Sequence, residues 1–423
     1  MTNPTENPRR SRRASKPAAG PVRHSRSGVR VGRRSVLSII AIAVAVLLVS
    51  GGSVAAIAAY DIYQSRHTVA LVGEDTIPSI GEIEGGFNVL LVGSDTREGQ
   101  SNNYGPDPGS TLNDVNMLLH VSADHKSATV VSIPRDMVVH IPDCPNGGGG
   151  WTGPINATLN EGGLGCVVLT VEALTGLKIP YAAIVTFDGV ADLSNVIGGV
   201  QVCVGSKIED PYTDTFLEPG MHTLQGLAAL QFLRTRHGVG DGSDLGRISN
   251  QQNFMSSLVR KVKAENLLTN PVLLYKVGKS VVSHLILSNS LASVDTVVSM
   301  AMAFKSIDLN NIVFVQYPGS TGGDGVYKGK VKPDTEAGDE LFAALLKDQP
   351  VKVTGGLGRG AEAGTAPKAT ATPTPTPTAK ASGSATPTPT KTATPKPTVA
   401  PVELPGNISG QTAGEYTCAI GNN

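Results

Sequence analysis

The stretch "FNVLLVGSDTR", residues 87–97, indicates the fold class, because an apolar, β-branched run leads directly into polar and charged residues. Apolar runs of similar length recur along the chain at 115–121, 128–134, 181–187, 198–204 and 311–318. Their length and composition are typical of β-strands. We therefore expect six strands, the first of which ends close to Asp95 and Arg97.

Apolar residues with helical spacing fill the segments around and between these runs. The helical pattern covers about 161–176, 188–197, 223–235, 247–265, 270–285, 290–304 and 335–347. Helices that alternate with strands pack on both faces of a sheet. The sequence therefore predicts one α/β domain over residues 86–350, a three-layer αβα fold with a central mixed sheet.

Charged residues stand at the ends of three apolar runs. Asp95 and Arg97 follow the first run, Asp114 stands just before the second, and Arg135 follows the third. In open α/β sheets such strand ends line the ligand crevice. We therefore expect two acids and two arginines to converge there, although an Asp at a strand end is more often a turn or helix cap.

The stretch "LRTRHGVGDGSDLGR", residues 233–247, places Arg234, Arg236 and Arg247 around four glycines. A Gly-rich turn ahead of a helix offers free backbone N–H groups to an anion, and guanidinium groups match phosphate oxygens. This combination predicts a phosphate or pyrophosphate site. A solvated, charged helix face is the alternative.

The charge of the chain is unevenly distributed. Residues 1–35 contain ten Lys and Arg and one acidic residue, so the remainder, with 25 basic and 34 acidic residues, carries a net charge of −9. An acidic remainder argues against a general nucleic-acid surface, which would be basic. We therefore expect a basic cytoplasmic leader at 1–35 and no nucleic-acid partner.

Residues 35–60 contain no charged residue and are long enough to cross a bilayer as a helix. We expect a transmembrane helix at 36–60 and a juxtamembrane segment at 61–85. The Arg cluster at 23–34 should stay in the cytoplasm, which predicts a single-pass cell-membrane protein with its domain outside. A cleaved signal peptide is the alternative, because small residues near Ala59 could serve a signal peptidase.

The four cysteines are an even set in a chain expected to be exported, which favours disulfides over buried free thiols. Four cysteines allow three pairings. Cys144 and Cys166 flank one Gly-rich loop, so a local bridge between them is the preferred pairing and leaves Cys203 and Cys418. No Cys or His spacing indicates zinc.

The composition changes again near the C-terminus. Residues 355–405 are mostly Gly, Ala, Thr and Pro and are too poor in apolar residues to form a core. We expect a disordered Pro/Thr/Ala-rich linker at 351–405. The short tail at 406–423 is too small to be a domain, and Cys418 could attach it to the core.

Five motifs together carry a resemblance to a known family. They are "NVLLVGSDTR" (88–97), "NDVNMLLHVSADHKSATVVSIPRDMVV" (113–139), "INATLNEGG" (155–163), "YAAIVTFDGVADLSNVIGGVQVCV" (181–204) and "ALQFLRTRHGVGDGSDLGRISNQQ" (229–252). In this order they resemble the actinobacterial members of the LytR-CpsA-Psr family, over residues 86–266. That family attaches glycopolymers, carried on a polyprenyl pyrophosphate, to peptidoglycan.

The resemblance implies roles for these charged residues. Asp95 and Asp114 would hold a Mg²⁺ ion, or Mn²⁺ in its place, that bridges the pyrophosphate. The residues that would bind the pyrophosphate oxygens are Arg97, Arg135, Arg234, Arg236, Arg247 and Gln251. The polyprenyl chain would enter an apolar tunnel beneath the site.

The implied reaction is a phosphotransfer outside the membrane. The muramic acid 6-hydroxyl of peptidoglycan would attack the sugar-side phosphorus, and polyprenyl phosphate would leave. Mg²⁺ and arginines would stabilise the charge that builds on the phosphoryl oxygens. Asp244 and Asp95 are both candidates for the general base. The implied catalytic residues are Asp95, Arg97, Arg135, Arg236, Arg247 and Asp244.

Two positions depart from the family pattern. Leu112 stands where an Arg is usual, two residues before the second acid, and Asn250 also replaces an Arg. The loop 98–112 could supply the missing charge. Two alternatives to the ligase therefore stay open: a polyprenyl-pyrophosphate phosphatase, and a membrane-tethered lipid-binding or regulatory protein without turnover.

Overall fold

The structure, a computed structural model, describes residues 67–74, 85–97, 111–265, 270–292, 294–366 and 400–422, with a few single positions outside these ranges. The predicted leader at 1–35 lies outside the described residues, as does the predicted transmembrane helix at 36–60 apart from three single positions. Within the described part of the chain, no helix combines the length and the apolar character that crossing a membrane needs.

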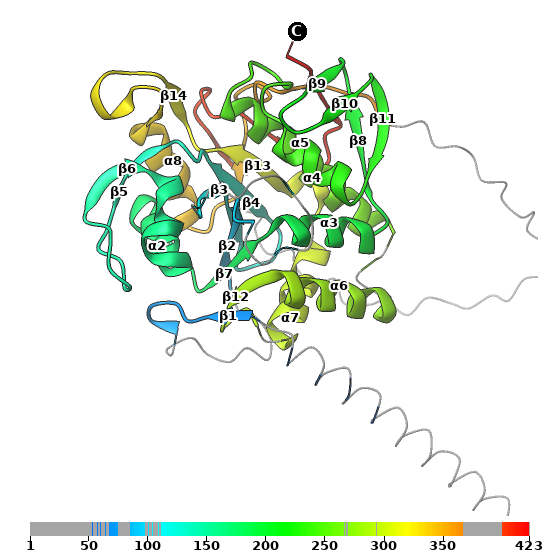
Figure 1. Cartoon of the computed structure of the whole chain (residues 1–423), viewed down its shortest axis with the longest axis horizontal. Helices are drawn as coiled ribbons and strands as arrows, with labels where there is room; N and C mark the ends of the chain where they lie inside the picture. Colours follow the sequence, from blue (N-terminus) through cyan, green and yellow to red (C-terminus); the bar gives the residue numbers. More distant parts are fainter. Residues whose placement is uncertain are drawn as a thin grey trace, which may run out of the picture. The chain divides into compact units, whose positions relative to one another are not determined.

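An eight-stranded mixed sheet forms the centre of the unit that begins at Tyr60 (Figure 1). Its strands, in spatial order, are β1 (His67–Val69), β12 (Leu285–Ser288), β7 (Tyr181–Val185), β2 (Phe87–Ser94), β3 (Asn113–Val121), β4 (Ala128–Ile133), β13 (Ile312–Gln316) and β19 (Gly410–Thr412). The pairs β1–β12, β7–β2 and β4–β13 are parallel, and the other neighbours are antiparallel. The prediction of a mixed central sheet is therefore confirmed.

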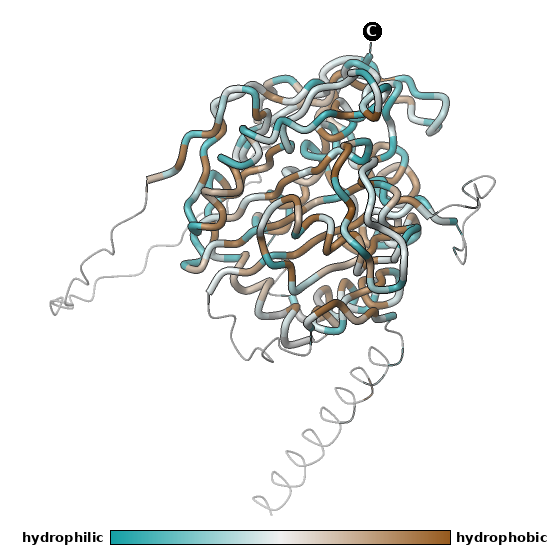
Figure 2. Tube along the Cα trace, turned by 90° about the vertical axis from the view of Figure 1, so that its left-hand side faces the viewer, coloured by the Kyte–Doolittle hydropathy of each residue, from teal (hydrophilic) through white to brown (hydrophobic). Residues whose placement is uncertain are grey.

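Helices cover both faces of this sheet, which gives the expected three layers. Helices α2 (Thr158–Thr175) and α8 (Thr335–Leu346) share one apolar core with Leu90 and Val92 of β2. The opposite face, with Phe87 and Val89, packs on α5 (Asp244–Ala264), α6 (Pro271–His284) and α7 (Val294–Ser306). Because both faces are covered, the central strands are mostly apolar, and Figure 2 shows hydrophobic segments running through the interior.

A second, four-stranded sheet lies against α5. Its spatial order is β11 (Gly220–Leu224), β8 (Val200–Val204), β20 (Thr417–Ala419) and β17 (Ala361–Ala363). The apolar core beneath it includes Phe232 of α4 (Leu227–Arg234) and Phe254 of α5. The expected strand at 198–204 therefore belongs to this sheet and not to the central one, because its partners are β11 and β20.

Four two-stranded pairs and one further helix complete the described elements. The pairs are β5 (Val138–Ile141) with β6 (Trp151–Pro154), β9 (Ile208–Asp210) with β10 (Thr215–Leu217), β14 (Gly319–Thr321) with β15 (Val331–Pro333), and β16 (Val351–Lys352) with β18 (Val402–Glu403). The further helix is α3 (Phe187–Val196), and Thr186 caps its N-terminus through the Gly189 N–H. Short 3₁₀ turns lie at 155–157, 309–311 and 325–327.

Both disulfides are present in the structure. Cys144–Cys166 joins the loop between β5 and β6 to α2, and Cys203–Cys418 joins β8 to β20. The first is the preferred local pairing, and the second joins the two cysteines that this pairing leaves. Every cysteine is bonded, so none is a free thiol.

The C-terminal segments differ from the expected linker and tail. Residues 351–366 and 400–405, expected within the linker, form β16, β17 and β18. The expected tail at 406–423 supplies β19 to the central sheet and β20 to the second sheet. The tail joins the core because several of its apolar residues, including Ile408 and Ala419, are fully buried. Residues 367–399 of the expected linker lie outside the described residues.

Candidate functional site

An apolar cavity of about 290 Å³ lies between the central sheet and helices α3, α4 and α5. Its apolar lining includes Leu91, Val115, Met117, Val190, Leu193, Leu230, Phe254, Met255 and Leu258. Charged and amide side chains also line it, from Asp114, Arg234, Arg247 and Gln251. Asp114 stands near the start of β3, Arg234 at the end of α4 and Arg247 in the first turn of α5, so the charges gather at one end.

Asp114 is the centre of an ion-pair network at that end. Its Oδ1 lies 2.6 Å from Nη1 of Arg135, and its Oδ2 lies 3.7 Å from Nη1 of Arg247. Arg247 also donates from Nη2 to the backbone carbonyl of Asp114 at 2.7 Å. Two arginines therefore converge on one carboxylate: Arg135, from the predicted set of strand-end residues, and Arg247, from the Gly-rich stretch.

Asp244 joins the same network from the first turn of α5. Its Oδ1 lies 2.6 Å from Nη2 of Arg247 and 3.9 Å from Nε of Arg135. Ser243 caps the helix by accepting the Gly246 N–H, and an acid in the first turn is favoured by the helix dipole. Burial acts to lower the pKa of Arg135, but the charges of Asp114 and Asp244 outweigh it and hold that pKa above its ordinary value.

Asp95 lies beside this network, at the end of β2. Its Oδ1 accepts the N–H of Leu112 at 2.7 Å, and its own N–H donates to the Leu112 carbonyl. Burial raises the pKa of Asp95, and the charge of Asp114 raises it further, against the opposing Leu112 hydrogen bond. Leu112 therefore holds Asp95 through its backbone. This contact does not depend on the Leu112 side chain, which stands where the resemblance leads us to expect an Arg.

The charge of Asp114 disfavours the ionised form of Asp95, and a divalent cation bound by both carboxylates would offset this effect. Mg²⁺ is often bound by one or two carboxylates, with substrate phosphates and water completing the shell. Asp95 and Asp114 supply such a pair. Within the described residues, no group of three or more His, Cys, Asp or Glu side chains forms a larger cation site.

Arg234 and Arg247 line the same end of the cavity, and the charge of Arg97 acts on Arg234 there. Burial lowers the pKa of Arg234, and the nearby charges of Arg97 and Arg247 lower it further. The Arg234 guanidinium lies over the Phe187 ring, 4.4 Å from its centroid, which is a cation–π contact. Like charges held this close in a buried place favour the binding of an anion between them.

Arg236 is one of the predicted site residues that the structure does not bring into the ion-pair network. Its backbone N–H donates to Asp210, and its buried Nε has no hydrogen-bond partner within the described residues. No ion pair joins its side chain to an acid in that part of the chain. Its role as a phosphate ligand stays a prediction.

Gln251 and Asn250 tie α5 to the end of α4. The Gln251 side-chain N–H donates to the Leu233 carbonyl at 3.1 Å, and that of Asn250 donates to the Phe232 carbonyl at 2.6 Å. Asn250 is fully buried. Asn250 stands where the resemblance leads us to expect an Arg. Its amide fixes the end of α4, which carries Arg234.

Asp210 is a buried residue that sequence reasoning missed. Its Oδ2 accepts the Thr235 hydroxyl at 2.7 Å, and it also accepts the N–H groups of Arg236, His237 and Gly238 at 2.9, 3.0 and 3.3 Å. These bonds set the start of the Gly-rich turn. The sequence signal is weak, because an Asp before a Pro is typical of an ordinary turn.

Asp210→Asn is expected to lower the melting temperature at neutral pH. The melting temperature of the variant should also fall less than that of the parent as the pH is lowered. Burial would raise the pKa of Asp210, but the donated hydrogen bonds outweigh it and hold that pKa below its ordinary value. A carboxyl group whose pKa is lowered by folding stabilises the fold at pH values above its pKa in the unfolded chain, about 3.9. This contribution disappears as the pH falls through the pKa of the folded state. The gap between the melting temperatures of parent and variant should therefore narrow below about pH 4. A gap of constant size from pH 7 to pH 3 would contradict this.

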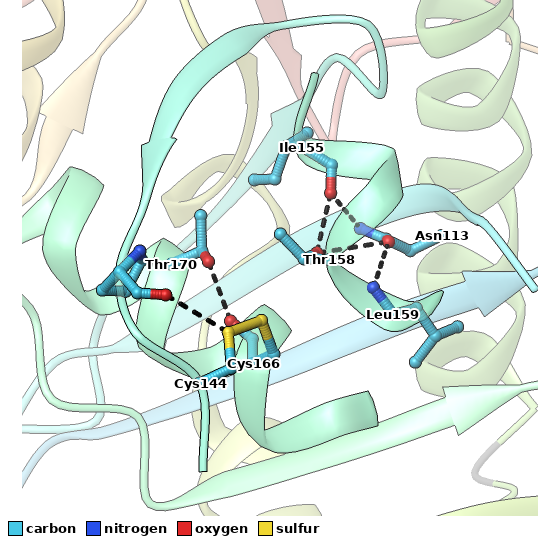
Figure 3. Close-up of a disulfide and its surroundings, with 8 residues drawn as sticks. Asn113, Cys144, Ile155, Thr158, Leu159, Cys166 and Thr170 are labelled. Atoms are coloured by element: carbon cyan, nitrogen blue, oxygen red, sulfur yellow. Dashed lines mark hydrogen bonds between the residues drawn. A yellow bond between two sulfur atoms is a disulfide. The ribbon is translucent and has the colours of Figure 1, made fainter. Parts of the chain in front are cut away.

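Asn113 is a second buried residue that connects two of the motifs. Its amide donates to the Asn116 side chain and to the Ile155 carbonyl, and its Oδ1 accepts the Leu159 N–H at 3.1 Å. Figure 3 shows this cluster beside the Cys144–Cys166 disulfide. The start of β3, and with it Asp114, is therefore fixed to the first turn of α2.

Comparisons with known proteins agree with these observations. The model of the LytR_cpsA_psr family matches residues 51–343. The chain is 30% identical over 333 residues to the cell wall biosynthesis protein LcpA of Corynebacterium glutamicum, a match that covers 72% of this chain and 63% of that protein. It is 32% identical over 240 residues to the polyisoprenyl-teichoic acid–peptidoglycan teichoic acid transferase TagT of Bacillus subtilis, which covers 54% of this chain and 70% of that protein.

A solved structure shares the fold. The crystal structure of Bacillus subtilis TagV matches with a TM-score of 0.50 and 21% identity, over 63% of this chain and 97% of that chain. At this identity the likeness concerns the fold alone. The central mixed sheet with its covering helices is thus an arrangement found in a solved protein.

Proposed function

Because the chain belongs to the LytR-CpsA-Psr family, we propose that it is a ligase that moves a glycopolymer from a polyprenyl-pyrophosphate carrier to peptidoglycan. The observation that carries this proposal is the apolar cavity that ends at Asp114, Arg234 and Arg247. A long hydrocarbon chain with an anionic head matches such a cavity, since its tail prefers apolar walls and its head prefers guanidinium groups. The names of LcpA and TagT support a role in cell wall synthesis and a transferase activity.

The arginines of the site would bind and orient the pyrophosphate. The charges of Arg97 and Arg247 lower the pKa of Arg234, and a phosphate group bound beside Arg234 would oppose that effect. Arg135 is held in place by Asp114 and Asp244 and presents a positive charge that does not titrate near neutral pH. The apolar walls would keep the lipid phosphate at a fixed depth.

Asp95 and Asp114 are the residues that would hold Mg²⁺. When bound, the ion would neutralise charge on the phosphoryl oxygens during transfer. Asp95 and Asp244 both stay candidates for the general base, because two arginines pair with the Asp244 carboxylate and Mg²⁺ would bind that of Asp95. The base would accept the proton of the muramic acid 6-hydroxyl as that oxygen attacks the sugar-side phosphorus and polyprenyl phosphate leaves.

A direct assay separates this proposal from the alternatives. The purified full chain is incubated with a lipid-pyrophosphate glycan and peptidoglycan oligomers, with and without Mg²⁺. A covalent glycan–peptidoglycan product supports the ligase. Phosphate release without that product would indicate a phosphatase, and donor binding without either product would indicate a lipid-binding or regulatory protein.

The topology of the proposed enzyme is also testable. We propose that residues 36–60 anchor the chain in the cell membrane with the leader in the cytoplasm, since peptidoglycan lies outside. A reporter that is active only outside the membrane, fused after residue 85, should be active. Exchanging the ten basic residues of the leader for neutral ones should reduce that activity. A reporter that is active only in the cytoplasm would contradict the whole assignment.

A further inference from the structure

We infer that the C-terminal segments 358–363 and 417–422, together called the strap, are a positioning element for the anion-binding turn at 236–247. The inference rests on the proposed function, because it assumes that the arginines of this turn bind the donor pyrophosphate. The first segment of the strap falls within the predicted linker at 351–405 and the second lies beyond it, and no residue of either segment lines the apolar cavity. Its role would be to fix the backbone that carries Arg236 and Arg247.

The end of the chain bonds directly to the backbone of the turn. The Gly240 N–H donates to the Ile420 carbonyl at 2.9 Å, and the Asn422 N–H donates to the Gly238 carbonyl at 3.0 Å. The Asn422 side-chain amide donates to the His237 carbonyl at 3.0 Å. Three hydrogen bonds therefore fasten the first half of the turn to the last residues of the chain.

The other part of the strap packs on the second half of the turn. Nη1 of Arg359 lies 2.7 Å from Oδ2 of Asp241. A Cβ atom added at Gly360 would lie 2.5 Å from the carbonyl oxygen of Gly246, so the two backbones are in direct contact. Gly246 belongs to the first turn of α5, between Asp244 and Arg247. The strap thus supports the helix start from which these two side chains project.

The turn needs such support because its own sequence does not specify one conformation. Gly240 and Gly242 have φ values of +56° and +71°, in the region that glycine enters freely, and glycine loses more conformational entropy on ordering than other residues. Asp210 holds only the start of the turn, at residues 235–238. The strap, itself fixed by β20 and by the Cys203–Cys418 disulfide, holds the rest together with bonds inside the turn from Gly242 to Val239 and from Ser243 to Asp241.

A matched pair of glycine substitutions tests this role. Gly360→Ala forces the Gly246 carbonyl to shift, whereas a Cβ at Gly356 has no atom within 4 Å, and neither glycine has a positive φ. We expect Gly360→Ala to weaken the binding of farnesyl pyrophosphate by about tenfold, the size of one misplaced charge-assisted hydrogen bond. Gly356→Ala should bind like the parent. Isothermal titration of the full chain measures both.

A second variant and a second measurement keep the test independent of activity. A chain that ends at Ala419 loses the three bonds to the turn but keeps Cys418 and β20. Hydrogen exchange should accelerate over 236–247 in this variant and in Gly360→Ala, with no change in β2, β3 and β4. The truncated chain should also bind farnesyl pyrophosphate more weakly than the parent.

The outcomes separate the inference from the proposed function. A parent that binds the probe, with variants that match it in exchange or in affinity, would overturn the inference and leave the proposed function standing. A parent that does not bind farnesyl pyrophosphate would overturn the proposed function at this site, and the inference with it. Faster exchange together with weaker binding in both variants, and neither in Gly356→Ala, supports the strap as a positioning element.

Discussion

Asp114→Asn is expected to lower the rate of glycopolymer transfer by about a hundredfold or more. The Asp114 carboxylate lies within ion-pair distance of Arg135 and of Arg247, and its charge acts on Asp95. A hydrogen bond to a charged group contributes about 1.5–3 kcal/mol, so losing the charge at one such contact costs about a tenfold to hundredfold change. Two contacts are affected here. The proposed Mg²⁺ site also loses one of its two carboxylates, so the Mg²⁺ concentration for half-maximal rate should rise.

The matched control for this variant is Asp124→Asn, which removes the same charge from the exposed turn after β3. Asp124 bonds to Ser122 and to the Lys126 N–H and contacts no residue of the site. It should transfer glycopolymer like the parent. Circular dichroism at the assay temperature must show both variants folded, because Asp114 is partly buried among arginines. Full activity of folded Asp114→Asn would remove this residue from the catalytic set.

The sequence predicts the covered strands and the helices well, because their patterns are local. β4 and β13 are buried along their whole length, so each appears as a mostly apolar run, within two residues of the expected bounds. α5 and α8 likewise follow their helical spacing closely. Such elements can be recognised from composition and period alone.

The short edge strands could not be predicted in the same way. β1 and β19 contain three residues each and are defined by their partners β12 and β13, which lie far away in the sequence. β12 follows α6 without a break, so the expected helix at 270–285 runs into it. Because long-range pairing defines these strands, neither period nor composition marks them.

The charged residues of the site were predictable because they stand next to strong signals, at strand ends and in a Gly-rich turn. What the sequence does not reveal is which groups they bond. Arg247 donates to the backbone carbonyl of Asp114 and forms an ion pair with the Asp244 carboxylate, so part of its guanidinium group binds other parts of the protein. Replacing Arg247 by Lys should therefore lower stability as well as transfer, contrary to the expectation for an arginine that contacts only phosphate.

Val190→Trp is expected to weaken the binding of farnesyl pyrophosphate by at least about a hundredfold, because excluding four methylene-sized groups from an apolar cavity costs about 3 kcal/mol. Val190 lies on α3 and lines the cavity, which is about 290 Å³ in volume. An indole at this position fills space that the lipid would occupy. The cavity is apolar there, so the larger side chain should not unfold the protein.

The decisive comparison is between two probes that share a head group. Val190→Trp leaves Asp114, Arg234 and Arg247 in place, so inorganic pyrophosphate should bind to it as tightly as to the parent. The control Ala228→Trp adds the same indole to an exposed position of α4 and should bind both probes normally. Loss of the lipid probe alone would show that the apolar cavity holds the tail and the arginines hold the head. If Val190→Trp bound farnesyl pyrophosphate like the parent, the tail would have to lie elsewhere, and the cavity would no longer support a polyprenyl-linked donor.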